Sequence, residues 1–116
     1  MSEDQLQSEC YQWAWNNFPS TRRLLFSVPN GGTRNTREAM KLKATGLTAG
    51  VADLLFLWYG KTFAFELKVG TNKQSENQKL WEMTATPHIE KYYLITNFED
   101  FKFHFTQIVH GNTSTQ

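Results

Sequence analysis

The fold of this chain is decided by Gly50–Lys68, whose sequence is GVADLLFLWYGKTFAFELK. Two apolar runs flank Tyr59-Gly60, a dipeptide typical of a tight turn, and this pattern predicts a β-hairpin. If these two residues form the loop, counting outward pairs Asp53 with Glu66. Opposed strand residues have Cβ atoms about 4.5–5.5 Å apart, and like charges at that distance destabilise the pair. The sequence therefore predicts a compensating cation, with a divalent metal as the leading candidate.

The second strand of the predicted hairpin alternates in character. Glu66 and Lys68 share one face because side chains two positions apart point the same way, whereas Phe63 and Phe65 share the other. The Phe-rich face implies a covering layer. An ordinary alternative for the polar face is a salt-bridge cluster of Lys68, Glu66 and Asp53. A three-residue loop would shift the register by one and separate Asp53 from Glu66.

Length and composition limit the class of protein. With 116 residues, a hydrophobic fraction of 40% and nine Phe, the chain fits one domain with a real apolar core. The single cysteine, Cys10, excludes an internal disulfide and all cysteine-based zinc patterns, so we expect an intracellular, reducing setting. No apolar run approaches the roughly 20 residues of a membrane span, and the polar first residues do not resemble a signal peptide.

Basic residues are concentrated in one part of the chain. Positions 21–50 hold six of the 12 Lys and Arg residues and one of the 11 acids, although the net charge is only +1. A basic segment in a nearly neutral protein indicates a local anionic partner such as a nucleic acid backbone. A solvated face is an equally ordinary explanation of this segment taken alone. The candidates for DNA backbone contacts are Asn30, Arg34, Arg37, Lys41 and Lys43.

Periodicity predicts the remaining elements. In chain order we expect a helix over about 3–17, a strand over 24–28, a helix from Asn35 to about Thr45, the hairpin, a helix over about 76–86, a strand over 91–96 and a helix opening with Thr96 as its cap. An alternating run at 101–105 leaves a strand as the alternative for the last element. The polar tail of residues 111–116 is expected to be disordered. Ser75 and Gln78 fit a capping box, so Gln78 has a purely structural explanation.

The chemical signature of the hairpin is an acid followed after twelve residues by E-x-K, formed by Asp53, Glu66 and Lys68. Oxygen ligands suit Mg²⁺ or Mn²⁺, which usually take one or two carboxylates plus waters and substrate phosphate oxygens. A bound metal lowers the pKa of a coordinated water and offsets charge on a phosphodiester. Lys68, on the same face as Glu66, can orient or activate that water or stabilise developing negative charge. Taken alone, this spacing also recurs by chance.

Other segments accompany this signature in a fixed order. They are Pro29-Asn30-Gly31-Gly32, Arg34, Leu42-Lys43-Ala44-x-Gly46-Leu47, Gly50-Val51-x-Asp53-Leu54, Glu66-Leu67-Lys68 and Ser75-x-x-Gln78. The combination resembles the VRR-NUC branch of the PD-(D/E)XK nuclease superfamily, particularly its small stand-alone members from phages and bacteria. The resemblance covers roughly residues 5–109. It departs from the family pattern at Ala49 and Ala52, where proline is usual, and at 86–89, where a glycine-containing turn is common.

The resemblance implies a fold and a reaction. The fold would be α/β and restriction-endonuclease-like, a mixed central sheet flanked by helices in the order α-β-α-β-β-α-β-α, within one domain over residues 1–110. The reaction would be Mg²⁺- or Mn²⁺-dependent hydrolysis of DNA phosphodiesters without an organic cofactor, in the cytoplasm of a bacterial or phage-infected cell. Branched DNA such as a Holliday junction would be the substrate of a homodimer.

The resemblance also implies roles for single residues. The metal would be held by Glu9, Asp53, Glu66 and the Leu67 carbonyl. Lys68 would be the catalytic lysine, and Gln78 the active-site glutamine that positions Lys68 or the substrate. One rival interpretation is a non-catalytic nucleic-acid-binding module that uses the basic 22–43 segment. The other is a structural domain in which the charged cluster is only a salt bridge.

Overall fold

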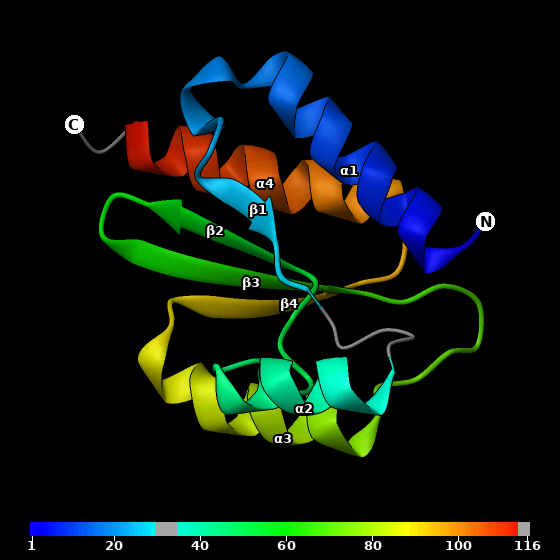
Figure 1. Ribbon diagram of the computed structural model, residues 1–116. Helices are drawn as coiled ribbons and strands as arrows, with labels where there is room; N and C mark the ends of the chain where they lie inside the picture. Colours follow the sequence, from blue (N-terminus) through cyan, green and yellow to red (C-terminus); the bar gives the residue numbers. More distant parts are fainter. Residues whose placement is uncertain (30–34, 114–116) are drawn as a thin grey trace.

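Four strands form one mixed sheet with helices on both faces (Figure 1). The computed structural model describes residues 1–29 and 35–113. The elements in chain order are α1 (Glu3–Asn17), η1 (Pro19–Thr21), β1 (Leu25–Ser27), α2 (Thr36–Ala44), β2 (Leu54–Trp58), β3 (Lys61–Leu67), α3 (Glu76–Ala85), η2 (Thr86–His88), β4 (Lys91–Ile95) and α4 (Phe98–Thr113). Apart from the short 3₁₀ turns η1 and η2, this is the predicted order, and the last element is a helix rather than the alternative strand.

The sheet has the order β1-β2-β3-β4. The β1–β2 and β2–β3 pairs are antiparallel, whereas β3 and β4 are parallel, which makes the sheet mixed. Helices α1 and α4 lie on one face, and α2 and α3 lie on the other (Figure 1). The predicted restriction-endonuclease-like architecture, a mixed sheet flanked by helices, is therefore confirmed.

The hairpin formed by β2 and β3 has the predicted two-residue loop. Tyr59-Gly60 have φ angles of 49° and 78°, and two positive φ angles are what a type I′ hairpin turn requires. Leu54 pairs with Phe65, so the next position outward sets Asp53 level with Glu66. The strand register set by a two-residue loop, on which the predicted pairing of Asp53 with Glu66 depends, is therefore confirmed.

The apolar core lies between the sheet and the α1/α4 layer. Phe56 and Phe65 point into it from β2 and β3, and Phe101 and Phe105 meet them from α4, all fully buried. The Phe56 and Phe105 ring centroids are 4.7 Å apart. Burying a side chain of this size stabilises the fold by roughly 1.5–3 kcal/mol. The covering layer predicted from the Phe-rich strand face is therefore present.

The α2/α3 layer is held differently, since neither helix has a buried residue. A close backbone approach fixes the start of α3 instead. Gly50 has φ of 84°, and a Cβ atom added there would clash with the Asn77 carbonyl group. Only glycine fits this position, because both the conformation and the space exclude a side chain.

The C-terminal helix differs in two details from the prediction. Its cap is Asn97, whose Oδ1 accepts from the Asp100 N–H at 2.8 Å, rather than Thr96. Helix α4 runs to Thr113, so Gly111–Thr113 are helical rather than part of a disordered tail, and residues 114–116 lie outside the described residues. In the described ranges, none of the helices combines the length and apolar character needed to cross a membrane.

Substituting Gly50 tests the contact with α3. Gly50→Ala should lower the free energy of unfolding more than Gly60→Ala, because only Gly50 adds a clash to the conformational cost. Gly60 is the matched control, with φ of 78° and nothing within 4 Å of the added Cβ. The positive φ alone costs roughly 1–2 kcal/mol in an L-residue. Urea denaturation measures both variants, and equal losses would contradict the close approach.

Candidate active site

Asp53 is held by the strands on either side of it. It directly precedes β2, and its Oδ2 accepts the Leu67 N–H of β3 at 2.8 Å. Its own carbonyl accepts the Val28 N–H, beyond the end of β1, at 3.0 Å. The residue that the sequence proposed as a backbone ligand, Leu67, thus contributes its N–H to the site, and the role of its carbonyl stays a prediction.

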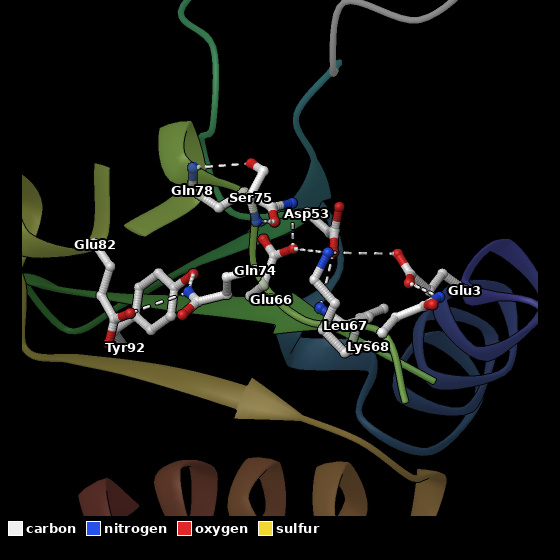
Figure 2. A network of polar contacts seen from close by, with 11 residues as sticks. Glu3, Asp53, Glu66, Leu67, Lys68, Gln74, Ser75, Gln78, Glu82 and Tyr92 are labelled. Atoms are coloured by element: carbon white, nitrogen blue, oxygen red, sulfur yellow. Dashed lines mark hydrogen bonds and ion pairs between the residues drawn. The ribbon is translucent and has the colours of Figure 1, made fainter. Parts of the chain in front are cut away.

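Glu66 lies at the centre of the site and is fully buried (Figure 2). Its Oε2 accepts from Gln78 Nε2 at 2.7 Å and lies 3.6 Å from Lys68 Nζ. Its Oε1 is buried without a hydrogen-bond partner among the described residues. Buried polar atoms almost always have partners, so an unpartnered carboxylate oxygen indicates that a ligand belongs there.

Lys68 connects the hairpin to the first helix. Its ammonium lies between Glu66 and Glu3, 3.9 Å from Glu3 Oε1, and it is almost fully buried (Figure 2). Glu3 also accepts from Asn72 Nδ2 at 2.9 Å, in the segment between β3 and α3. The first turn of α1 is thereby tied to the site by two polar contacts.

Gln78 forms the predicted cap and also contacts Glu66. As a cap, its Oε1 accepts the Ser75 N–H at 2.8 Å, while its own N–H donates to Ser75 Oγ at 3.2 Å. Its remaining amide nitrogen then donates to Glu66. Because the cap occupies the amide oxygen, Nε2 is the atom that faces the carboxylate. The contact is with Glu66, and the role of Gln78 in positioning Lys68 or the substrate stays a prediction.

The first helix brings a different acid to the site from the one predicted. Glu3 contacts Lys68, whereas Glu9 is exposed and lies six residues further along α1, about 9 Å of helix rise away. A role for Glu9 as a metal ligand stays a prediction, and its position does not favour it. The sequence does contain a signal for Glu3: Ser2 and Gln5 form a capping box that begins the helix directly before it.

A second polar network extends the site and was not predicted. Gln74 Nε2 donates to Tyr92 Oη and to Glu82 Oε1, both at 3.0 Å (Figure 2). Burial and the charge of Glu66 raise the pKa of Tyr92 above its ordinary value. Tyr92 pairs with Ala64, two positions before Glu66, so strand alternation puts both on one face. The sequence did not predict the position of Tyr92, because that position depends on β4 lying beside β3, which local sequence patterns do not show.

The pKa values of both acids are raised above their ordinary values. Burial, followed by the charge of Asp53, raises the pKa of Glu66 from 4.5 to about 8. Burial also raises the pKa of Asp53, against the Leu67 hydrogen bond that lowers it. Lys68 lowers both values without restoring them. A site with this balance favours either protonation or an added cation.

The donor set fits a divalent cation of the Mg²⁺ type. In the part of the chain that the structure describes, no group of three or more His, Cys, Asp or Glu side chains converges on one point. Asp53 and Glu66 therefore offer two carboxylates, with one oxygen of Glu66 unpartnered. Mg²⁺ is usually held by one or two carboxylates, its other positions being filled by water and substrate phosphate. An all-protein cage is not expected for such an ion.

The predicted DNA-contacting residues are only partly within the described chain. Arg37, Lys41 and Lys43 are exposed on α2, on the sheet face opposite α1 (Figure 1). Asn30 and Arg34 lie outside the described residues. The basic side chains of α2 are accessible to a large anionic partner, and their contact with DNA stays a prediction.

The fold and site define a restriction-endonuclease-like α/β domain with a two-carboxylate and lysine centre. A solved structure described as a VRR_NUC domain protein superposes with a TM-score of 0.72, covering 92% of this chain and 87% of that chain. The sequence identity is 19%, so the likeness shows a common fold, and the VRR-NUC resemblance is supported at that level. No protein-family model matches the sequence, and no curated protein gives a significant match.

The raised pKa of Glu66 predicts how stability depends on pH when chelator removes divalent cations. The folded state binds the Glu66 proton more tightly than the unfolded state does. Protonated Glu66 therefore stabilises the fold fully below the ordinary pKa of 4.5, and this stabilisation is lost as pH rises through about 8. At about 1.4 kcal/mol per pH unit, the loss is at most about 5 kcal/mol.

Urea denaturation from pH 5 to 8 in EDTA measures this loss. Glu66→Gln, which is uncharged throughout, should flatten the decline. Glu9→Gln, at an exposed position, should leave it as in the wild type. A wild-type stability that does not fall over this range would contradict the shift.

Proposed function

We propose that this protein is a divalent-metal-dependent nuclease that hydrolyses DNA phosphodiester bonds. The observation that carries the proposal is the buried Glu66 carboxylate, with one unpartnered oxygen, next to Asp53 and Lys68. A structural salt bridge leaves this arrangement unexplained, because the ion pair with Lys68 involves Glu66 Oε2 and leaves the buried Oε1 without a hydrogen-bond partner among the described residues. The fold shared with a VRR_NUC domain protein supports the same conclusion.

Asp53 and Glu66 are the residues that would hold Mg²⁺ or Mn²⁺. When bound, such an ion supplies a water of lowered pKa and neutralises charge on the phosphodiester. The Leu67 N–H fixes one oxygen of Asp53, and Gln78 fixes one oxygen of Glu66. Each carboxylate is therefore oriented by a hydrogen bond, and Glu66 keeps a second oxygen that has no hydrogen-bond partner among the described residues.

Lys68 is the proposed catalytic lysine. Its ammonium lies 3.6 Å from Glu66 on the same strand face, so it is positioned beside the phosphate that these carboxylates would bind through a metal. There it orients the attacking water or stabilises the negative charge that develops on the phosphate. Glu3 holds the ammonium from the other side, and we assign to Glu3, as the first-helix acid of the site, the role of positioning Lys68.

The proposed substrate is branched DNA, cut by a homodimer. The exposed cations of α2 are suited to backbone contacts, which position a duplex without reading its sequence. This chain contributes one site, whereas paired incisions on a two-fold symmetric junction require two. A two-fold dimer supplies them with the spacing fixed by its symmetry.

Cleavage assays with junction, flap and linear duplex DNA test this function. Wild type should cut with Mn²⁺ and not with EDTA, and it should favour the junction. Asp53→Ala and Lys68→Ala should each lower the rate by at least about a hundredfold, as expected when charge stabilisation in the transition state is lost. Lys79→Ala, which removes an exposed lysine paired with Glu76, is the control.

The same assays separate the rival interpretations. Undiminished cutting by Asp53→Ala or Lys68→Ala would refute the assigned site. A non-catalytic binder would show salt-sensitive DNA binding indifferent to Mn²⁺ and to Asp53, and no cutting. Equal cutting of all three DNAs would remove the junction preference and leave the nuclease assignment in place.

A matched pair of variants tests the exchange of Glu9 for Glu3. Glu3→Gln should lower kcat by at least about tenfold or raise the Mn²⁺ concentration needed for half-maximal rate, because it removes a charge that holds Lys68. Glu9→Gln makes the same chemical change on the same helix and should retain wild-type kinetics. The reverse pattern, with loss only in Glu9→Gln, would restore the original prediction.

A further inference from the structure

Three polar side chains form a network beside the site, called here the Gln74 network, which consists of Gln74, Glu82 and Tyr92. In the view of Figure 2 they lie on one side of Glu66, and Lys68 lies on the other. All three are half-buried, and they come from the segment before α3, from α3 itself and from strand β4. The proposed chemistry gives these residues no role.

Gln74 lies at the centre of the network and uses both hydrogens of its amide nitrogen. Its Nε2 donates to Tyr92 Oη and to Glu82 Oε1, each at 3.0 Å. A side-chain amide nitrogen carries two donors, so both are satisfied here. One bond leads to the sheet and the other to α3. Gln74 therefore connects the helix to strand β4.

Helix α3 uses one face for its contacts with this part of the protein. Gln78, Trp81 and Glu82 are three and four positions apart, so they share that face. Gln78 donates to Glu66, and Glu82 belongs to the Gln74 network. The Trp81 ring centroid lies 6.1 Å from that of Tyr92. Hydrogen bonds depend on direction, whereas apolar burial does not, so the two polar contacts orient α3 as well as attach it.

The position of Gln74 also sets the position of the α3 cap. Gln74 directly precedes Ser75, which is the N-cap. The Ser75 N–H donates to Gln78 Oε1 at 2.8 Å, and Gln78 Nε2 then meets Glu66 at 2.7 Å. A displacement of Gln74 therefore moves Ser75 and, with it, the Gln78 amide group.

We propose that the Gln74 network positions the Gln78 amide so that it stays directed at Glu66. The inference rests on the proposed nuclease function, in which Glu66 holds the metal. The network residues act through Gln78 and contact neither metal nor substrate. Catalytic groups have to be held within about 0.5 Å of the productive geometry, and a misplacement of about 1 Å can lower a rate roughly a hundredfold.

Simple attachment of α3 is the ordinary alternative, and it explains these residues less well. Replacing two hydrogen-bonded partners by apolar groups of the same shape can be nearly neutral for stability or even favourable. Attachment alone therefore does not require a half-buried amide between a carboxylate and a hydroxyl. A satisfied polar network does make its surroundings rigid and selects one arrangement. Rigidity of this kind is what the Gln78–Glu66 contact needs.

NMR of side-chain amides, on the whole protein in EDTA, tests the positioning without any cleavage. The Gln78 Nε2 resonance, identified by its loss in Gln78→Leu, should differ from that of exposed Gln107, because it donates to a buried carboxylate. Tyr92→Phe removes one hydroxyl, keeps the ring and should move this resonance toward the exposed value. Tyr59→Phe makes the same change at an exposed turn residue and should leave the resonance in place.

Cleavage kinetics with Mn²⁺ give the second measurement. Tyr92→Phe and Glu82→Ala should each lower kcat by about tenfold, as expected for a small misplacement, and leave KM for DNA unchanged. Glu82→Gln keeps an oxygen that can accept from Gln74, so it should retain most of the wild-type kcat. Tyr59→Phe should have wild-type kinetics. Urea denaturation checks that each variant folds and measures its stability.

An unchanged Gln78 resonance or an unchanged kcat in Tyr92→Phe would overturn the proposal, and so would equal losses of kcat in Glu82→Ala and Glu82→Gln. A lower free energy of unfolding with both measurements as in wild type would show that the network only attaches α3. Failure of the nuclease function would appear separately, as absent cutting by wild type with Mn²⁺. The amide resonance would then still decide whether the network directs Gln78.

Discussion

The structure depends on how the Glu66 carboxylate is kept inside the protein. A buried carboxylate is costly unless it is paired and hydrogen-bonded. Here Gln78 and Lys68 share one oxygen, while the other has no partner among the described residues. Adjacent Asp53 increases the cost by like-charge repulsion. This unfavourable arrangement persists because the surrounding fold is well packed, with four fully buried Phe side chains on the opposite face of the sheet.

The same contacts also attach the α2/α3 layer to the sheet. Neither helix has a fully buried residue, and the Trp81 ring of α3 contacts the Tyr92 ring of β4. The start of α3 is fixed by Gly50 against Asn77 and by the Gln78–Glu66 hydrogen bond. Gln74 adds a link from the segment before α3 to Tyr92 on β4. The hydrogen bond that forms part of the site therefore also positions α3 against the sheet, so a substitution at Glu66 affects both.

Local sequence rules predicted the features that depend on neighbours in the chain. Tyr59-Gly60 determined the hairpin register, which in turn placed Asp53 opposite Glu66. The contact of Glu3 with Lys68 was not predicted, because periodicity locates a helix without saying which end meets the hairpin. That depends on how α1 packs over the sheet beside α4. Tyr92 was missed for the same reason, since its neighbour across the sheet lies 28 residues earlier in the chain, at Ala64.

The first helix serves both the core and the site. Leu6, Cys10 and Ala14 are its buried positions, spaced by four. A helix rotates 100° per residue, so fixing this buried stripe also fixes the direction of the first turn. Packing of α1 against the sheet and α4 therefore places Glu3 at Lys68.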